Sequence, residues 1–225
     1  MSAGDTPLTD RTLRTLAQSM SGGLLAYVGC MTTIVGPLLW IASAVAYFTA
    51  EAVAAVAVPG YSYIVDYISS LGVPGTSPHA TVMNAAFLLQ GVCFPAGAVL
   101  LVCGTRARKA LPFLVFAVLN GVGNVLVGVV HGGTGSRWHL AGAVLAIVGG
   151  NLAVLAGAWL FRHAGTSAVY VAASAVLGGM GIFCATALAV EATPIGLWER
   201  GSVYPIFVWQ TLTAGYLVRR RTEIA

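Results

Sequence analysis

Charged side chains are scarce in this 225-residue sequence, since Asp, Glu, Lys and Arg together make up only 8% of it. Hydrophobic residues supply 58% of the chain, and the mean hydropathy is +0.87. A soluble domain of this length has too little interior to bury that much apolar surface. The shortage of charge therefore excludes an ordinary soluble protein and predicts an all-α fold that crosses a membrane several times.

Basic residues are also too few and too scattered to form a nucleic-acid surface. Ten arginines and one lysine face seven acidic residues, giving a net charge of +4, and they stand at the ends of apolar runs. The four cysteines (Cys30, Cys93, Cys103 and Cys184) lack the C-x-x-C spacing of metal-binding or redox motifs. The sequence thus predicts no nucleic-acid partner, no disulfide framework and no cofactor.

What the sequence has instead is a series of long apolar runs, each close to the roughly 20 residues that cross a bilayer. The first run continues past the length of a signal-peptide core, so we interpret it as a retained span. One transmembrane domain is predicted over 24–218, with a cytoplasmic N-terminal tail over 1–23 and a basic cytoplasmic tail over 219–225. The six predicted transmembrane helices cover 24–48, 81–103, 111–131, 138–161, 168–190 and 203–218.

The connection between the first two predicted spans is long and contains YSYIVDYISSLG, residues 61–72. Its second half repeats apolar and polar positions at helical spacing, and residues that break helices bracket it on both sides. We therefore expect a short interfacial or re-entrant helix there, with Asp66 in its middle. An aspartate among Tyr, Ile and Val either has a structural role in a loop or belongs to a functional site.

The distribution of arginine predicts how the chain lies in the membrane. With six spans and both termini in the cytoplasm, the inner segments hold nine basic residues and the outer loops hold only Arg137 and Arg200. An excess of positive charge on the cytoplasmic side is typical of multi-pass proteins of the plasma (inner) membrane. In this orientation we expect Glu51 to be an interfacial cap, and Glu199 to pair with Arg200 in the third outer loop.

The ionisable residues of the outer side include the predicted catalytic candidates Asp66, Glu199, His131 and His139. Apolar surroundings suit a carboxyl group to donate a proton, which favours Asp66 as a general acid. The alternative is that Asp66 only caps a helix or a loop at the interface. Glu199 is expected either to pair with Arg200 in the loop or to join Asp66 in one polar pocket of a functional site.

The third predicted span carries polar side chains on one face, because Asn120, Asn124 and His131 follow one another at intervals of four and seven residues. Polar groups in hydrocarbon need partners, so this face should meet either a wet cavity or the polar groups of other helices. Aromatic residues near the outer ends of the spans either line such a cavity or form the interfacial belt. The predicted substrate-binding residues are Tyr61, Tyr63, Tyr67, Ser69, Ser70, Asn84, Asn120, Asn124, Trp138, Trp198 and Tyr204.

Three stretches together carry a resemblance to a known family: YSYIVDYISSLG, then MNAAFLLQG, and GLWERGSVYPIFVW near the C-terminus. They are similar to a bacterial integral membrane family catalogued as domain of unknown function 998, over about residues 25–218. The resemblance implies a six-helix fold and no particular activity. The recurring polar positions that it implies are those near Asp66, Ser70, His139 and Glu199-Arg200.

Three functions remain open. The first is an enzyme that protonates a prenyl, isoprenoid or other lipid-like substrate by carboxylic-acid catalysis, as terpene cyclases do, with aromatic walls that shield the cation. The second is a transmembrane lipid hydrolase that uses Ser, His and Asp, or zinc held by His131, His139 and either Asp66 or His79. The sequence lacks an H-x-x-x-H pair and a G-x-S-x-G elbow, so the hydrolase ranks below the acid catalyst. The third is non-enzymatic lipid binding or transport.

Overall fold

The computed structural model describes residues 34–105, 109–162 and 166–222. The predicted N-terminal tail, the start of the first predicted span and Cys30 lie outside the described residues. Within the described ranges the chain forms helices and no strand, as the composition predicts.

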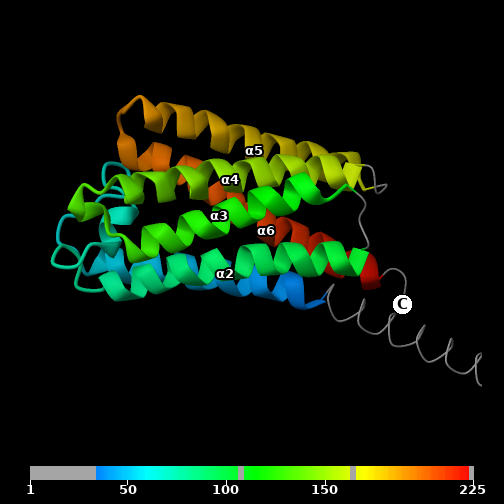
Figure 1. The fold of residues 1–225 in the computed structure, drawn as a ribbon, viewed down its shortest axis with the longest axis horizontal. Helices are drawn as coiled ribbons and strands as arrows, with labels where there is room; N and C mark the ends of the chain where they lie inside the picture. Colours follow the sequence, from blue (N-terminus) through cyan, green and yellow to red (C-terminus); the bar gives the residue numbers. More distant parts are fainter. Residues whose placement is uncertain (1–33, 106–108, 163–165, 223–225) are drawn as a thin grey trace, which may run out of the picture.

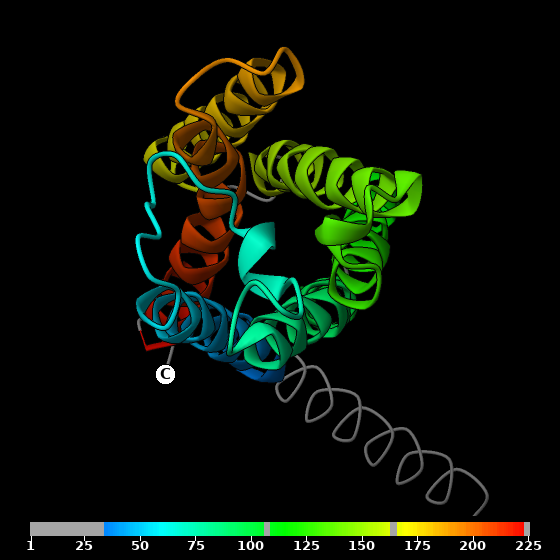
Figure 2. The same ribbon diagram turned by 90° about the vertical axis from the view of Figure 1, so that its left-hand side faces the viewer.

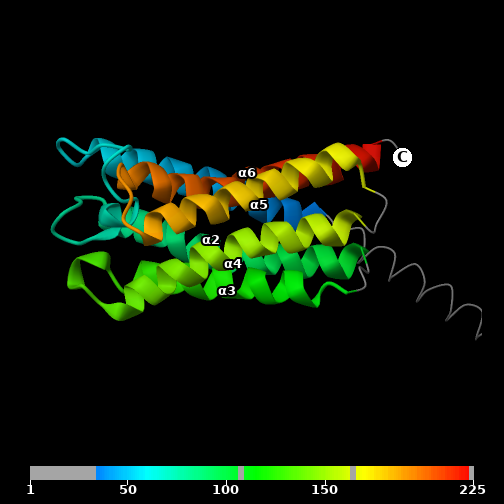
Figure 3. The same ribbon diagram turned by 90° about the horizontal axis from the view of Figure 1, so that it is seen from above.

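Six long helices of the described chain lie side by side along the long axis of the molecule (Figure 1, Figure 3). Five of them are long and apolar enough to cross a membrane, so the prediction of a multi-pass helical membrane protein is confirmed. These five are the N-terminal helix, described over Ile34–Val56, then α2 (Ala80–Thr105), α3 (Leu111–Val129), α4 (Arg137–Arg162) and α5 (Ala168–Ala189).

The remaining helix, α6 (Ile195–Thr222), runs alongside these five but is more polar, so composition does not mark it as membrane-spanning. It begins before the predicted span 203–218 and continues past 218 into the segment predicted as a basic tail. The N-terminal helix likewise continues to Val56, beyond its predicted end at 48. Both extensions matter because they place charged residues inside helices, where the sequence predicted loops or interfacial positions.

Residues 57–79, here called the cap loop, do not contain the predicted interfacial α-helix. Their one helical element is η1 (Ser69–Gly72), a four-residue 3-10 helix. The side chain of Asp66 bonds to nearby backbone, because its Oδ2 accepts a hydrogen bond from the N–H of Ser62 at 2.7 Å. Such local bonds compete with helix formation. Asp66 therefore lies in a turn rather than in the middle of a helix.

The cap loop, the α3–α4 connection and the α5–α6 connection gather at one end of the bundle, which we call the capped end (Figure 1). The last turns of α2, α4 and α6 lie at the opposite end (Figure 1). Seen along the bundle from the capped end, the helices form a ring, and η1 lies over its middle (Figure 2). Because successive long helices run in opposite directions, the three predicted outer loops come together at the capped end.

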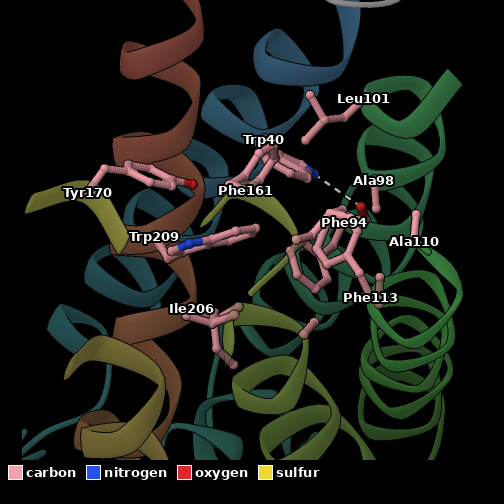
Figure 4. Packing of buried hydrophobic residues seen from close by; sticks show 14 residues of the cluster. Trp40, Phe94, Ala98, Leu101, Ala110, Phe113, Phe161, Tyr170, Ile206 and Trp209 are labelled. Atoms are coloured by element: carbon pink, nitrogen blue, oxygen red, sulfur yellow. Dashed lines mark hydrogen bonds between the residues drawn. The ribbon is translucent and has the colours of Figure 1, made fainter. Parts of the chain in front are cut away.

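Buried aromatic and aliphatic side chains pack into one core (Figure 4). This core lies in the half of the bundle away from the cap loop. Trp40 and Trp209 are fully buried, with ring centroids 5.5 Å apart. The indole Nε1 of Trp40 donates to the carbonyl oxygen of Phe94 at 3.0 Å, so its polar atom is paired inside the core. Phe113 packs against Trp209 from α3. This dense apolar half contrasts with the capped half, where buried polar groups gather.

Candidate functional site

One arginine holds the capped end of the bundle together. Arg200 of α6 is only 5% exposed and forms an ion pair with Glu51 of the N-terminal helix, with 3.0 Å between Nη2 and Oε1. Its Nε donates to the same oxygen at 3.0 Å, and the hydroxyl of Tyr204 lies 2.9 Å from both carboxylate oxygens. Glu51 is thus fully paired although it is buried. The predicted pairing of Arg200 with Glu199 is therefore wrong, and Glu51 lies buried inside the N-terminal helix rather than at a cap.

The same guanidinium group ties the cap loop to α6. Nη1 donates to the carbonyl oxygens of Tyr63 at 2.7 Å and Asp66 at 2.9 Å, and Nη2 donates to the hydroxyl of Tyr61. The guanidinium carbon also lies 4.7 Å from the centre of the Tyr63 ring, within cation–π range. Burial raises the pKa of Tyr61 to about 12, so this phenol stays neutral beside the ion pair. Arg200 and the cap loop therefore form one structural unit.

Glu199 precedes Arg200 in sequence but serves a different part of the molecule. Its buried carboxylate accepts a hydrogen bond from the backbone N–H of Ile68, just before η1. Burial raises the pKa of this carboxyl from 4.5 to about 7, against the lowering effects of the Ile68 hydrogen bond and of the Arg200 charge. Glu199 lies ahead of the predicted span 203–218, at the level of the cap loop. A carboxyl that titrates near neutral pH can both give and take a proton.

A cavity lies beneath η1, and Glu199 forms part of its wall. Its volume is about 40 Å³, which holds about three water molecules at roughly 10–15 Å³ each. The wall includes both aromatic rings and amide side chains. These residues are Tyr47, Phe87, Phe207, Gln90, Asn120 and Asn124.

Two amide oxygens of this wall have no hydrogen-bond partner within the described part of the chain. Nδ2 of Asn120 donates to the carbonyl oxygen of Ala146 at 2.6 Å and leaves Oδ1 unpaired. Nε2 of Gln90 donates to Gln210 at 3.0 Å and leaves Oε1 unpaired. A buried polar group without a partner costs about 1–3 kcal/mol. These oxygens therefore favour a cavity that is occupied by water or by a ligand.

The family model described as Protein of unknown function (DUF998) matches residues 41–216. The chain belongs to the DUF998 family. The match includes the cap loop and every wall residue named above, and it confirms the resemblance carried by YSYIVDYISSLG and the two later stretches. No curated protein and no solved structure matches the chain.

Asp66 of this DUF998 protein is not among the residues that line the Glu199 cavity. Its side chain is partly exposed and accepts the hydrogen bond from Ser62, while only its backbone carbonyl meets Arg200. This is the geometry of an aspartate that caps a turn, which was the alternative considered from the sequence. The cavity has Glu199 in its wall without Asp66, so the two carboxyl groups do not share it.

The predicted histidines lie around the α3–α4 connection and before α2. His139, in the first turn of α4, places Nδ1 2.7 Å from the carbonyl oxygen of Val130, and His131 follows that residue. Among the described residues, no three His, Cys, Asp or Glu side chains lie close enough together to hold a metal ion. The zinc set of the hydrolase alternative, His131 and His139 with Asp66 or His79, is thus not assembled.

Three of the predicted substrate-binding residues, Ser69, Asn120 and Asn124, do line the cavity. Asn84 serves the cap loop instead, because its Nδ2 donates to the carbonyl oxygen of Gly72 at 2.8 Å. The others lie in the cap loop or on the turns of α4 and α6 near the capped end: Tyr61, Tyr63, Tyr67, Ser70, Trp138, Trp198 and Tyr204.

Three polar residues that stand alone in apolar runs were not predicted as buried groups of the capped half. Glu51 is isolated in AYFTAEAVAAV, Gln90 in FLLQG and Gln210 in FVWQT. The rule that polar groups in hydrocarbon need partners identified the two asparagines of α3, and it applies equally to these three residues. Nothing in the sequence marks Tyr47 as a wall residue, because its role depends on which helix faces it.

Proposed function

We propose that Glu199 acts as a general acid on the end group of a lipid-like substrate, with the cavity beneath η1 as the reaction site. The observation that carries this proposal is a buried carboxyl in the wall of a cavity that also has aromatic rings. Glu199 gives its proton to one alkene carbon of a prenyl or similar chain. The resulting Glu199 carboxylate then takes a proton from a carbon next to the cation, which shifts the double bond and restores the acid. Tyr47, Phe87 and Phe207 stabilise the cationic intermediate through cation–π contacts.

In this proposal Glu199 takes the role that the sequence favoured for Asp66. The reason is position, because the Asp66 carboxylate is partly exposed and is bound to its own turn. His131 and His139 lie at the α3–α4 connection, and His139 there contacts the backbone of Val130. The proposal therefore assigns proton transfer to one carboxyl and gives the histidines no part in it.

The proposal places the chain in the plasma membrane with both termini cytoplasmic and with α6 as the sixth span over 203–218. The arginine distribution supports this orientation, as does the gathering of the three predicted outer loops at the capped end. The polar side chains of α6 are compatible with a span, because Glu199, Arg200 and Gln210 are all buried against other helices. The cavity then lies in the outer half of the membrane.

The cavity volume limits the reaction. About 40 Å³ is far below the roughly 300–1,000 Å³ of pockets that enclose a whole drug-sized ligand. A prenyl chain folded for ring formation does not fit, whereas one end group fits and leaves the rest of the chain in the bilayer. The proposal is therefore isomerisation at one end of a lipid rather than the multi-step cyclisation of a terpene cyclase.

Lipid binding without chemistry is the second candidate function. The small cavity favours it, because a site that holds only an end group suits recognition as well as reaction. Both candidates share a hydrophobic or lipid partner and differ only in whether the Glu199 proton moves to the ligand.

The experiment that tests the proposal uses purified protein in nanodiscs and a panel of prenyl alcohols and prenyl hydrocarbons. Products of unchanged mass indicate isomerisation, and products that gain the mass of water indicate hydration or hydrolysis. Glu199→Gln should lower product formation by about 10²-fold or more, the usual contribution of a general acid. Asp66→Asn is the matched control and should leave the rate unchanged. Binding of the lipids without product by the wild type would overturn the acid role and leave lipid binding.

A further inference from the structure

We propose that the Glu199 cavity selects lipids whose end group donates hydrogen bonds, an alcohol or a protonated amine, and rejects chains that end in a carboxylate or a phosphate. This inference rests on the proposed function in placing the end group of the ligand in that cavity. It adds the chemical class of the ligand, which neither the family nor the acid role specifies.

The orientation of the Asn120 amide carries the argument. Its Nδ2 donates to the carbonyl oxygen of Ala146 at 2.6 Å, and a flipped amide would set two oxygens against each other there. Oδ1 is therefore the atom left without a partner, in a side chain that is 1% exposed. An unpaired acceptor in the wall of a cavity is satisfied only by a donor inside that cavity.

Each of the other amide nitrogens in the wall already donates one hydrogen bond to a protein acceptor. Nδ2 of Asn124 donates to the carbonyl oxygen of Asn120 at 3.0 Å, and Nε2 of Gln90 donates to Gln210 at 3.0 Å. The carboxylate of Glu199 is a further acceptor in the same wall. Oδ1 of Asn120 and the Glu199 carboxylate are thus two acceptors that a ligand can meet, which matches a hydroxyl or an ammonium group.

The charges around the cavity exclude an anionic end group. Among the described residues no basic side chain lines the cavity, and the nearby Arg200 is engaged by Glu51, the cap-loop carbonyls and Tyr61. A carboxylate or phosphate would lie beside Glu199 and Oδ1 of Asn120 without any cation to pair with. Burial of an unpaired charge is strongly unfavourable. An ammonium group meets the opposite situation, because Glu199 in its charged form is its counter-ion.

The test uses photoactivatable dodecyl probes that differ only in the end group: alcohol, amine, carboxylate or phosphate. Wild-type protein in nanodiscs is irradiated with each probe, and the labelled peptides are mapped by mass spectrometry. The alcohol and amine probes should label the segments of α3 and α4 around Asn120 and Ala146 about fivefold more than the two anionic probes, the effect of one hydrogen bond. Equal labelling by all four end groups, preference for an anion, or no labelling of these segments overturns the inference.

Two variants sharpen the result. Asn120→Leu removes the acceptor and should reduce alcohol labelling about fivefold, to the level of the carboxylate probe. Asn120→Asp, in its protonated form, donates to the carbonyl oxygen of Ala146 in place of Nδ2 and keeps the acceptor, so alcohol and amine labelling should be retained. The control is Val122→Leu, on the exposed face of the same helix, which should leave every probe unchanged. Since the wild-type comparison needs no variant, a folding failure of either Asn120 variant leaves the test intact.

The two proposals fail in different ways. Selective labelling by donor end groups without any product supports the ligand class and overturns acid catalysis by Glu199. Turnover of lipids without selectivity for donor end groups supports acid catalysis and overturns the ligand class.

Discussion

Two polar clusters lie next to each other in the capped half of this protein, and the sequence neighbours Glu199 and Arg200 belong to different ones. In the Arg200 cluster, all three guanidinium nitrogens and both oxygens of Glu51 have partners. In the Glu199 cluster, the amide oxygens of Asn120 and Gln90 have none within the described structure. The first cluster closes the cap loop over the bundle, and the second lines the cavity below it.

This difference separates a structural role from a binding role. A buried polar group that finds all its partners within the protein has no free donor or acceptor for a ligand. Its removal lowers the free energy of unfolding. A buried group that lacks a partner costs stability in the empty protein and is retained where something binds. The comparison predicts that substitutions in the Arg200 cluster change stability, whereas those in the Glu199 cluster change pH dependence, ligand binding or activity.

Arg200→Met should have the largest effect on stability. It leaves the Glu51 carboxylate buried beside the Tyr204 hydroxyl without a cation, and it releases the cap-loop carbonyls. The free energy of unfolding should fall by about 3–5 kcal/mol, as for other broken buried pairs. Circular dichroism during denaturant unfolding in micelles measures this change.

The control for Arg200→Met is the double variant with Glu51→Gln. It should recover part of the loss, because no unpaired charge then remains buried. A double variant less stable than Arg200→Met alone, or a single variant with wild-type stability, would contradict the structural role of the pair.

The same contrast explains what the sequence could predict. The central helices α2–α5 follow from apolar run length, and their predicted ends differ from the structure by two residues or fewer. The N-terminal helix and α6 extend further into the capped end than predicted, because Glu51 and Arg200 neutralise each other there. A charged residue marks the end of an apolar run when spans are predicted from hydropathy. A helix can nevertheless continue through a charged residue whose charge is paired inside the protein.

The site was predicted in part for the same physical reason. The stripe of Asn120 and Asn124 follows from helical spacing, and both residues line the cavity. The role of Asp66 did not follow, because its bond to Ser62 depends on a turn that the apparent helical periodicity concealed. The sequence alone also did not show that Glu199 and Arg200 contact different groups. Both residues lie within α6, and successive residues of a helix point in directions about 100° apart.

Gly196→Ala should have an intermediate effect, because it disturbs the contact between α6 and the cap loop. A Cβ atom at Gly196 would lie 2.5 Å from the carbonyl oxygen of Asp66 and 2.9 Å from its nitrogen. The clash is with backbone that Arg200 holds in place, so a loss of about 1–3 kcal/mol is expected in the free energy of unfolding. Limited proteolysis of the cap loop should accelerate in parallel.

Gly179→Ala on α5 is the matched control for this substitution. A Cβ atom there meets no neighbour within 4 Å, so the variant should be as stable as the wild type or more stable by up to about 1 kcal/mol. Equal behaviour of the two variants would show that the cap loop does not depend on its close approach to α6.

Glu199→Gln should change the pH dependence of stability more than stability itself. Because burial raises the pKa of Glu199 from 4.5 to about 7, the folded state binds this proton more tightly than the unfolded state. The contribution is complete below pH 4.5 and is lost as the pH rises through about 7. Gln retains an oxygen that accepts from Ile68, so the fold is kept.

Unfolding free energies at a series of pH values test this prediction. The stability of the wild type relative to Glu199→Gln should fall between pH 4.5 and about 7 and stay constant above that range. Parallel profiles for the two proteins would show that this carboxyl does not titrate in the folded protein near neutral pH.

Asp66→Asn should have the smallest effect of the set. The amide oxygen of Asn still accepts from the N–H of Ser62, and the backbone carbonyl that binds Arg200 is unchanged, so the free energy of unfolding should change by less than about 1 kcal/mol. Product formation and probe labelling should match the wild type, in contrast to Glu199→Gln. The substitution removes an acid and preserves the shape of the turn. A variant that keeps its stability but loses activity would therefore restore to Asp66 the catalytic role that its apolar neighbours in the sequence indicated, and would move the site from the cavity to the cap loop.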